Sequence, residues 1–390
     1  MFISRRFPYI PWNLLSFQLI SQLDNFKMNK SMRSKRKKKP TAMKSGGERS
    51  ERKPSKQTAK KPSTPAASER APKSKPKSNG ITCREQQEPS KNEKKTSKGG
   101  SKEMWTGEET AKKMVASGFF NNNTISGTFK DLPTLKPPLD SCPCFKNNLQ
   151  KVRAPDCPIP DDKLIKLTHA PDNFICASKV TVPEYNRTVI LTQVPDVSNA
   201  QNIEDFWRMI FQENVASVVI AVMPLESSVT LQQIFPLLNG TYSNHGKMFL
   251  NNKKVESAVA VTSYTLEILP DGCSNSLFTT VYHLHNWRQK RGLEQVGDLV
   301  NTLEKVLKTN ENTVFMSMNG TGRAGTMLAL FTAMAQVQKG KEVNPKETME
   351  KLRAERCGVV DNAEQYGTVH KAMAVWFKNK SNSEEIQKIA

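Results

Sequence analysis

The stretch that decides the fold is "NTVFMSMNGTGRAGTMLALF", residues 312–331. Its apolar run at 313–316 predicts a buried strand, and the apolar residues from 326 to 338 predict a helix that closes at Gly340. The glycine-rich loop between them presents backbone N–H groups and a helix N-terminus, which suit an oxyanion. Arg323 adds a planar fork of two donors. This combination predicts a cradle for a phosphate monoester dianion.

Two other phosphate-binding loops do not fit the surrounding sequence. Gly320, Gly322 and Gly325 satisfy the G-x-G-x-x-G pattern of dinucleotide-binding folds. That pattern needs a second strand with an acidic residue about 20 residues later. Here a second helix signal follows instead, with a capping asparagine, a proline and a capping glutamate at 344–347. A nucleotide-binding P-loop also fails, because no Lys-Ser/Thr pair follows the last glycine.

Strand and helix patterns alternate along the globular part of the chain, which predicts an α/β or α+β fold with a mixed sheet. The segment 121–160 is expected to be rich in loops, and Asn202 is expected to cap a helix. The other expected strands are 173–179, 187–192, 215–222, 257–268 and 276–285, and the other expected helices are 107–119, a segment around 299–307, and 362–378.

The charge divides the chain into regions. The protein has 390 residues and a formal net charge of +21, and residues 30–104 alone hold 24 Lys/Arg against 7 Asp/Glu. Because large apolar residues are scarce there, 28–104 is predicted to be a disordered, Lys-rich basic tail. Residues 105–382 form the predicted globular domain and 383–390 a C-terminal tail. Residues 1–27 are an extension of uncertain role, and translation could also start at Met28.

Location and general partners follow from composition. No run of about 20 apolar residues predicts a membrane span, and the seven scattered cysteines favour a reducing, intracellular compartment, cytoplasm or nucleus. Five consecutive basic residues at 35–39 are compatible with a solvated linker, a nuclear import signal or an anion contact. No aromatic residues interleave these lysines, so non-specific polyanion binding is expected rather than sequence-specific reading.

Two groups of side chains raise the question of a metal. Cys142 and Cys144 with Cys157 could form part of a site, but no fourth ligand has the usual spacing. His283 and His285 share one strand face without a third ligand in view. Isolated thiols and packed histidines are the favoured interpretation, so neither a metal nor a cofactor is expected.

The stretch "FMSMNGTGRAGTMLA" (315–329) resembles the signature loop of the classical protein tyrosine phosphatases, a His-Cys followed by five residues and an arginine. The resemblance extends over most of 105–380, and it implies a tyrosine-phosphatase-like fold, a twisted mixed β-sheet flanked by helices, in a monomeric domain. The Lys-rich leader also resembles the family's expanded nematode branch. Other stretches that match in order are "KNNLQKV" (146–152), "DNFICAS" (172–178), "EDFWRMIFQENVASVVIAV" (204–222), "HLHNWRQKRG" (283–292) and "LRAERCGVVDNAEQY" (352–366).

In this family, a cysteine thiolate attacks phosphorus and an aspartic acid protonates the leaving tyrosine oxygen. The resemblance places Ser317 at the nucleophile position, Met316 at the preceding histidine, and Gln289 at the general acid. A serine hydroxyl stays protonated near neutral pH, whereas a free thiol titrates near pKa ~8.5 and such a loop lowers it further. An amide has no proton to give, and a general acid is worth about 10²–10⁴ in rate.

Other positions of the family pattern are altered as well. Asp361 stands where the resemblance implies a glutamine that positions water, Leu149 where it implies a stacking aromatic, and Lys151 where it implies a carboxylate that holds the substrate backbone. Arg323 either binds an anion or pairs with an internal acid such as Asp361. The remnant of the phosphate-binding loop comprises Ser317, Met318, Asn319, Gly320, Thr321, Gly322 and Arg323.

The sequence therefore predicts a degenerate phosphatase domain, a pseudophosphatase, in which no residue is expected to be catalytic. Its expected role is in signalling, as a scaffold or binding module for a protein partner such as a phosphotyrosine protein. One alternative is an active tyrosine phosphatase with atypical machinery, using Ser317 or a thiol outside the motif such as Cys273 or Cys357. The other is association with nucleic acid or anionic membranes driven by the tail, with the domain as an interaction module.

Overall fold

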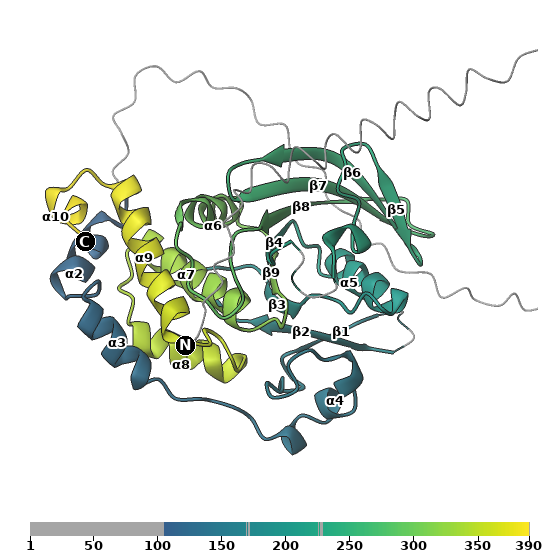
Figure 1. Ribbon diagram of the computed structural model, residues 1–390, viewed down its shortest axis with the longest axis horizontal. Coiled ribbons are helices and arrows are strands. Elements are labelled where there is room, and N and C mark those ends of the chain that lie inside the picture. Colours follow the sequence, from purple (N-terminus) through teal and green to yellow (C-terminus); the bar gives the residue numbers. More distant parts are fainter. Residues whose placement is uncertain (1–104, 169, 171, 225, 227–228, 390) are drawn as a thin grey trace, which may run out of the picture. The chain divides into compact units, whose positions relative to one another are not determined.

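The computed structural model describes residues 105–389, apart from 169, 171, 225, 227 and 228. The predicted extension (1–27) and basic tail (28–104) lie outside the described residues. Within the described part, one mixed sheet of nine strands has the order β1-β2-β3-β9-β4-β8-β7-β6-β5 (Figure 1). This confirms the predicted mixed α/β architecture.

The centre of the sheet is parallel. β3 (Val189–Gln193), β9 (Thr313–Ser317), β4 (Ser217–Ala221) and β8 (Leu277–Leu284) run side by side in one direction. Every residue of β3, β9 and β4 is buried, which explains their continuous apolar and β-branched runs. The outer strands pair antiparallel: β1 (Leu164–Lys166), β2 (Phe174–Val180), β5 (Tyr242–His245), β6 (Met248–Ser257) and β7 (Val261–Pro270).

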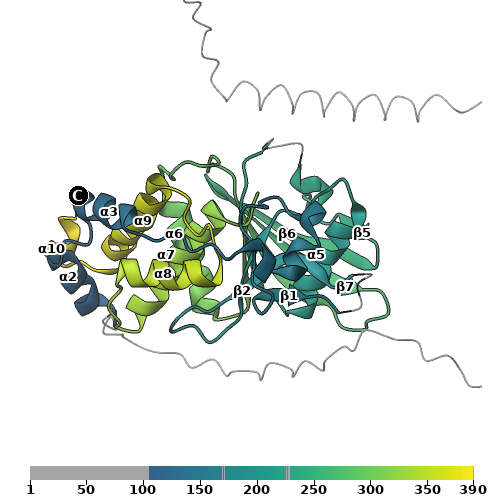
Figure 2. The same cartoon turned by 90° about the horizontal axis from the view of Figure 1, so that it is seen from below.

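Helices cover both faces of this sheet (Figures 1 and 2). On one face, α5 (Ala200–Gln212) packs Phe206 and Trp207 against strand residues such as Val314. The other face carries the larger cluster, where strand residues such as Phe315 meet helices from the C-terminal half. These helices are α6 (Gly297–Thr309), α7 (Gly322–Gln338), α8 (Pro345–Glu355) and α9 (Ala363–Lys380).

The helix α7 connects the sheet to the predicted cradle. It begins directly after the loop that follows β9, and almost all of its residues are buried between the sheet and α9. A helix that is apolar on all sides belongs in the interior. The N-terminus of α7 is therefore fixed by packing on several sides, which holds the loop in front of it in place.

The two ends of the described chain meet beside α9 (Figure 1). Trp105 packs edge-on against Trp376, with ring centroids 5.1 Å apart. In the stretch predicted as a C-terminal tail, α10 (Glu384–Gln387) packs on α9 and α2 (Glu108–Ala116), and Ile386 is fully buried. None of the helices in residues 105–389 combines the length and apolarity that a membrane crossing requires.

Two local predictions were wrong, whereas a third was confirmed. The segment 121–160 is rich in loops, as predicted, and it also contains α3 (Asn122–Lys130), which Asn121 caps by accepting a hydrogen bond from the N–H of Asn123, and α4 (Pro143–Lys146). The cap of α5 is Asn199, whose side chain accepts from the N–H of Gln201, rather than Asn202. The helix α7 starts at Gly322, earlier than the predicted 326, because Gly322 and Gly325 already adopt helical geometry.

Candidate functional site

The loop between β9 and α7 is folded tightly against neighbouring backbone. Gly320 has φ +66°, and a Cβ there would lie 2.6 Å from the backbone nitrogen of Gln193 on β3. Its N–H donates to the carbonyl of Ser317 at 3.1 Å. A Cβ on Gly325 would lie 2.6 Å from the Cα of Val359. Glycine is therefore required at both positions, since any side chain would push the loop away from the strand ends.

Arg323 lies below this loop and is held by an acid of its own chain. Its Nη1 donates to Oε2 of Glu226 and to the carbonyl of Trp287, both at 2.7 Å. Its Nη2 pairs with the other oxygen of Glu226. The side chains are 2% and 12% exposed, so this is a buried, two-point ion pair. Of the two possibilities predicted for Arg323, the structure has the internal pair, and its partner is Glu226 rather than Asp361.

Asp361 lies across the N-terminus of α7. Part of the residue is exposed, but Oδ2 lies so close to Gly322 that a Cβ there would overlap it. Withdrawal of the carboxyl from water raises the pKa of Asp361 above its ordinary range; the N–H of Gly322 and the charge of Lys290 oppose this. A carboxylate thus stands where backbone N–H groups were expected to face phosphate.

The buried side-chain amide of Gln365 also lies beside Gly322, at the N-terminus of α7. Gln365 is 1% exposed, and its Oε1 accepts from the backbone N–H of Asp361 at 2.9 Å. Its Nε2 has no hydrogen-bond partner in the described part of the chain and would lie 3.1 Å from a Cβ on Gly322. The side chain of Asn362 caps α9 by accepting a hydrogen bond from the backbone N–H of Gln365, which fixes the backbone position of Gln365. One donor beside the loop is therefore uncommitted.

Ser317, the nucleophile position, is the last residue of β9 and is 3% exposed. Its carbonyl accepts from the N–H of Val194 at 3.1 Å as well as from Gly320. Met316 and Met318 are buried in the core on the α5 side of the sheet. Among the described residues, no side chain accepts a hydrogen bond from the Ser317 hydroxyl, so no general base is in contact with it.

Gln289, the general-acid position, is exposed on a turn that is fastened to the start of α9. The carbonyl of Lys290 accepts from Nδ2 of Asn362 at 3.1 Å. The N–H of Gly292 donates to Glu364 at 3.0 Å. The 287–292 segment therefore lies against the start of α9, and the carbonyl of Trp287 accepts a hydrogen bond from Arg323 of the signature loop.

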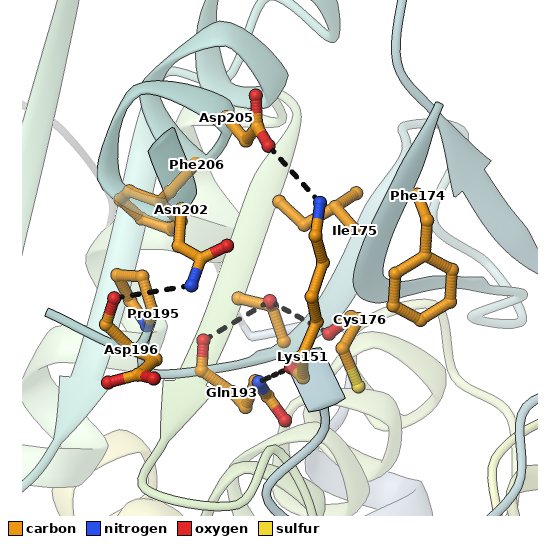
Figure 3. Close-up of a pocket in the computed structure, with 11 residues that line it drawn as sticks. Lys151, Phe174, Ile175, Cys176, Gln193, Pro195, Asp196, Asn202, Asp205 and Phe206 are labelled. Carbon is orange, nitrogen blue, oxygen red and sulfur yellow. Dashed lines mark hydrogen bonds and ion pairs between the residues drawn. The ribbon is translucent and has the colours of Figure 1, made fainter. Parts of the chain in front are cut away.

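Leu149 and Lys151 form a short 3-10 turn, η2 (Leu149–Lys151), in which Leu149 is 37% exposed. Lys151 approaches Asp172 at 2.7 Å and the buried Asp205 at 3.8 Å, the latter contact drawn in Figure 3. Gln193 donates to the carbonyl of Lys151 at 2.7 Å and so ties this turn to β3 (Figure 3). The cavity between these residues holds about 30 Å³, enough for about one water molecule rather than a ligand.

The candidate metal ligands are dispersed. Cys142 is buried beside Phe145, whereas Cys157 lies in another cluster in contact with Cys357. His283 is bonded through Nε2 to the carbonyl of Val222 at 2.7 Å. Within the described ranges, no group of three His, Cys, Asp or Glu side chains is placed to hold a metal ion.

Sequence reasoning missed Glu226. A signal existed, because Glu226 follows the end of β4 by five positions, and β4 lies parallel to β9. Parallel neighbours present their carboxyl ends at one edge of the sheet, where the loop with Arg323 also begins. The contact between Cys157 and Cys357 was missed as well, and 200 residues separate the two thiols.

Comparisons with known proteins agree on this region. The family model described as "Protein-tyrosine phosphatase" matches residues 148–375. The chain is 72% identical over 284 residues to the Caenorhabditis elegans protein named "Putative tyrosine-protein phosphatase C15H7.3", covering 73% of this chain and 71% of that protein. It is 26% identical over 254 residues to "Tyrosine-protein phosphatase non-receptor type 2" of Rattus norvegicus, covering 63% and 60% respectively.

A second Caenorhabditis elegans protein, "Putative tyrosine-protein phosphatase B0280.11", is 23% identical over 252 residues, covering 62% of this chain and 56% of that protein. The matched region thus spans between about half and seven tenths of these relatives' own lengths.

Proposed function

Since the chain belongs to the protein-tyrosine phosphatase family, we propose that it is a catalytically inactive member that binds a protein partner, such as a phosphotyrosine protein, without hydrolysing it. The observation that carries the proposal concerns the nucleophile position of the signature loop. A buried serine, Ser317, occupies this position, and no base in the described residues contacts its hydroxyl. The resemblance implies a thiolate at this position.

The chemistry of the two altered positions supports inactivity. Transfer of the phosphoryl group needs an electron-rich nucleophile, and a protonated hydroxyl is a poor one without a base. The departing tyrosine oxygen has a pKa of ~10 and leaves slowly unless it is protonated. Gln289 is exposed and carries no transferable proton. Cys357, one of the thiols considered as an alternative nucleophile, is buried, and its thiol is hydrogen-bonded to the thiol of Cys157.

A binding role has its own support. The uncommitted amide of Gln365 lies beside the N-terminus of α7, and Arg323, in the first turn of the same helix, supplies a guanidinium. These are donors, and they suit an oxyanion. The carboxylates of Glu226 and Asp361 already occupy part of the site, so an incoming phosphate must compete with them. We expect weak binding of free phosphate, in the millimolar range, with further affinity coming from a protein partner.

Turnover of an aryl phosphate by the full chain tests the proposal. We expect no phosphate release above buffer from para-nitrophenyl phosphate, both for the natural chain and for Arg323→Lys. Release that Arg323→Lys abolishes would overturn the proposal, because it would come from this loop. Release that survives in Arg323→Lys would identify a contaminating enzyme.

A gain-of-function series tests whether the two altered positions are the reason. Ser317→Cys alone should stay inactive, since Gln289 cannot act as an acid. Ser317→Cys with Gln289→Asp should release phosphate at a measurable rate. If the double variant folds but remains inactive, inactivity has another cause, and Asp361→Gln is the next change to add.

The branch of the family and the cellular location are also part of the proposal. We place it in the nematode branch of the family and inside the cell; the 72% identical relative from Caenorhabditis elegans supports the former. A truncated protein that begins at residue 105 distinguishes a binding role of the domain from a role driven by the basic tail. Partner binding should survive the truncation if the domain is the binding module.

A further inference from the structure

Two cysteines from opposite ends of the domain touch beside the signature loop. The Sγ atoms of Cys157 and Cys357 are 2.6 Å apart, and 200 residues separate them in the chain. Their residues are 9% and 4% exposed. A disulfide bond is ~2.05 Å long, so the two sulfurs need little movement to bond. None of the chemistry discussed for phosphate uses either thiol.

A buried cation lies next to this pair. Arg356 is 1% exposed, and its Nε and Nη1 have no hydrogen-bond partner in the described part of the chain. No carboxylate among the described residues forms an ion pair with it. A buried guanidinium without a counter-ion is costly, and a neighbouring anion relieves that cost. The neighbouring side chains that can become anionic include Cys176, which is hydrogen-bonded to Arg356, as well as Cys157 and Cys357.

The two thiols differ in their readiness to ionise. The hydrogen bond shared with Cys157 lowers the pKa of Cys357, and the charge of Arg356 lowers it further against the effect of burial. The same hydrogen bond raises the pKa of Cys157. Two thiols that share one proton, with a cation beside them, form the arrangement found in reactive dithiols.

We propose that Cys157 and Cys357 form a redox-active pair that hydrogen peroxide converts to a disulfide. The thiolate of one cysteine attacks the peroxide, its sulfur gains an oxygen to become a sulfenic acid, and the other oxygen leaves as water after protonation. The second cysteine then attacks that sulfur, the S–S bond forms, and a second water leaves. One peroxide is reduced by two electrons for each disulfide formed.

The position of the pair gives the modification a structural effect. A Cβ on Gly358, the residue after Cys357, would lie 2.6 Å from Sγ of Cys157 and 3.1 Å from Cγ2 of Thr321 in the signature loop. Val359 then forms a bridge with Gly322. The disulfide would fasten this segment next to the loop.

Two other buried thiols serve as internal controls. Burial raises the pKa of Cys142 and of Cys176, in Cys176 against the opposing effect of Arg356, and neither forms a disulfide. They should stay reduced under conditions that oxidise the pair, because the thiolate is the reactive form.

The test is a thiol map of the reduced full chain after exposure to hydrogen peroxide. Unreacted thiols are alkylated under denaturing conditions, and the protein is digested without reductant for mass spectrometry. We expect a peptide in which Cys157 is linked to Cys357, reversed by dithiothreitol, with Cys142 and Cys176 alkylated. Cys142→Ser should keep the link, and Cys157→Ser should lose it.

A second measurement does not depend on any variant folding. The disulfide closes a long loop, so the oxidised natural chain should melt higher than the reduced chain by roughly 5 °C or more. The proposal is overturned if Cys157 and Cys357 remain alkylatable after oxidation, or if they link to other cysteines. It is also overturned if oxidation leaves the melting temperature unchanged.

Discussion

Arg323 and Glu226 lie 97 residues apart in the chain and form a two-point ion pair beneath the signature loop, with Nη1 2.7 Å from Oε2. The pair occupies the two terminal nitrogens of the arginine that the resemblance assigns to phosphate. A phosphate ligand must therefore share or displace an acid of the protein itself. The affinity for phosphate and the stability of the domain are therefore linked through Arg323.

Glu226→Gln should destabilise the domain by about 2–4 kcal/mol, because it leaves a buried guanidinium without its counter-charge. Phosphate should recover part of that loss, since it binds the folded form. Urea unfolding with and without phosphate measures both effects. Glu364→Gln removes the partner of the exposed Arg291 and should cost less than about 1 kcal/mol. Equal losses in the two variants would contradict the assignment of a buried pair.

Asp361→Asn should strengthen binding of phosphate or orthovanadate about tenfold at pH 7, because it removes a negative charge from the N-terminus of α7. The gain should shrink as the pH falls through the raised pKa of Asp361, since the natural carboxyl then becomes neutral too. Titration calorimetry at several pH values measures the difference. Asp271→Asn, in the turn after β7, is the matched control and should change nothing. A gain that is independent of pH would argue against charge as its cause.

Gly325→Ala should destabilise the domain by about 2–4 kcal/mol, because its Cβ would meet the Cα of Val359 at 2.6 Å. Gly367→Ala is the contrasting change, since that helical glycine has open space around its Cβ position. It should be neutral or stabilise by up to about 1 kcal/mol. If thermal unfolding ranks the two variants in the opposite order, the loop is not packed as described.

Acid should weaken the fold between pH 6.5 and about pH 4. Burial lowers the pKa of His283 and of His370 to about 4, whereas both titrate near 6.5 when unfolded. The unfolded chain therefore binds more protons in this window, and stability falls as the pH falls, by up to about 3 kcal/mol for each histidine. His283→Gln keeps a donor for the carbonyl of Val222 and should flatten the pH profile. An unchanged slope would show that His283 is not buried in its neutral form.

The central strands of the sheet could be predicted from the pattern of apolar residues in the sequence. The strands β4 and β9 are continuous apolar runs because both faces are buried, and such runs are visible in a sequence. The edge strand β5 and its neighbour β6 were not predicted. Tyr242 of β5 is 67% exposed, and β6 has buried Met248 and Leu250 only in its first half and ends in polar residues, so the apolar signal of both strands is short.

Local polar signals were harder to place. Asn199 and Asn202 both suit a helix cap, and the structure selects Asn199. The sequence indicated that Arg323 needs an anionic partner, and it left open an anionic ligand or an internal acid such as Asp361. Glu226 was not among these alternatives. That choice depends on which carboxylate the finished sheet brings within reach, and the signal for Glu226, its position shortly after β4, can be used only once β4 and β9 are known to be parallel neighbours.

The central claim is that the loop holds an oxyanion without transferring it, and a single-turnover experiment tests it most directly. Full-length protein in excess is incubated for hours with a phosphotyrosine peptide, and both phosphate and dephosphorylated peptide are quantified. We expect the peptide to be recovered phosphorylated, both from the natural chain and from Arg323→Lys. Stoichiometric release of phosphate by the natural chain, lost in Arg323→Lys, would contradict it.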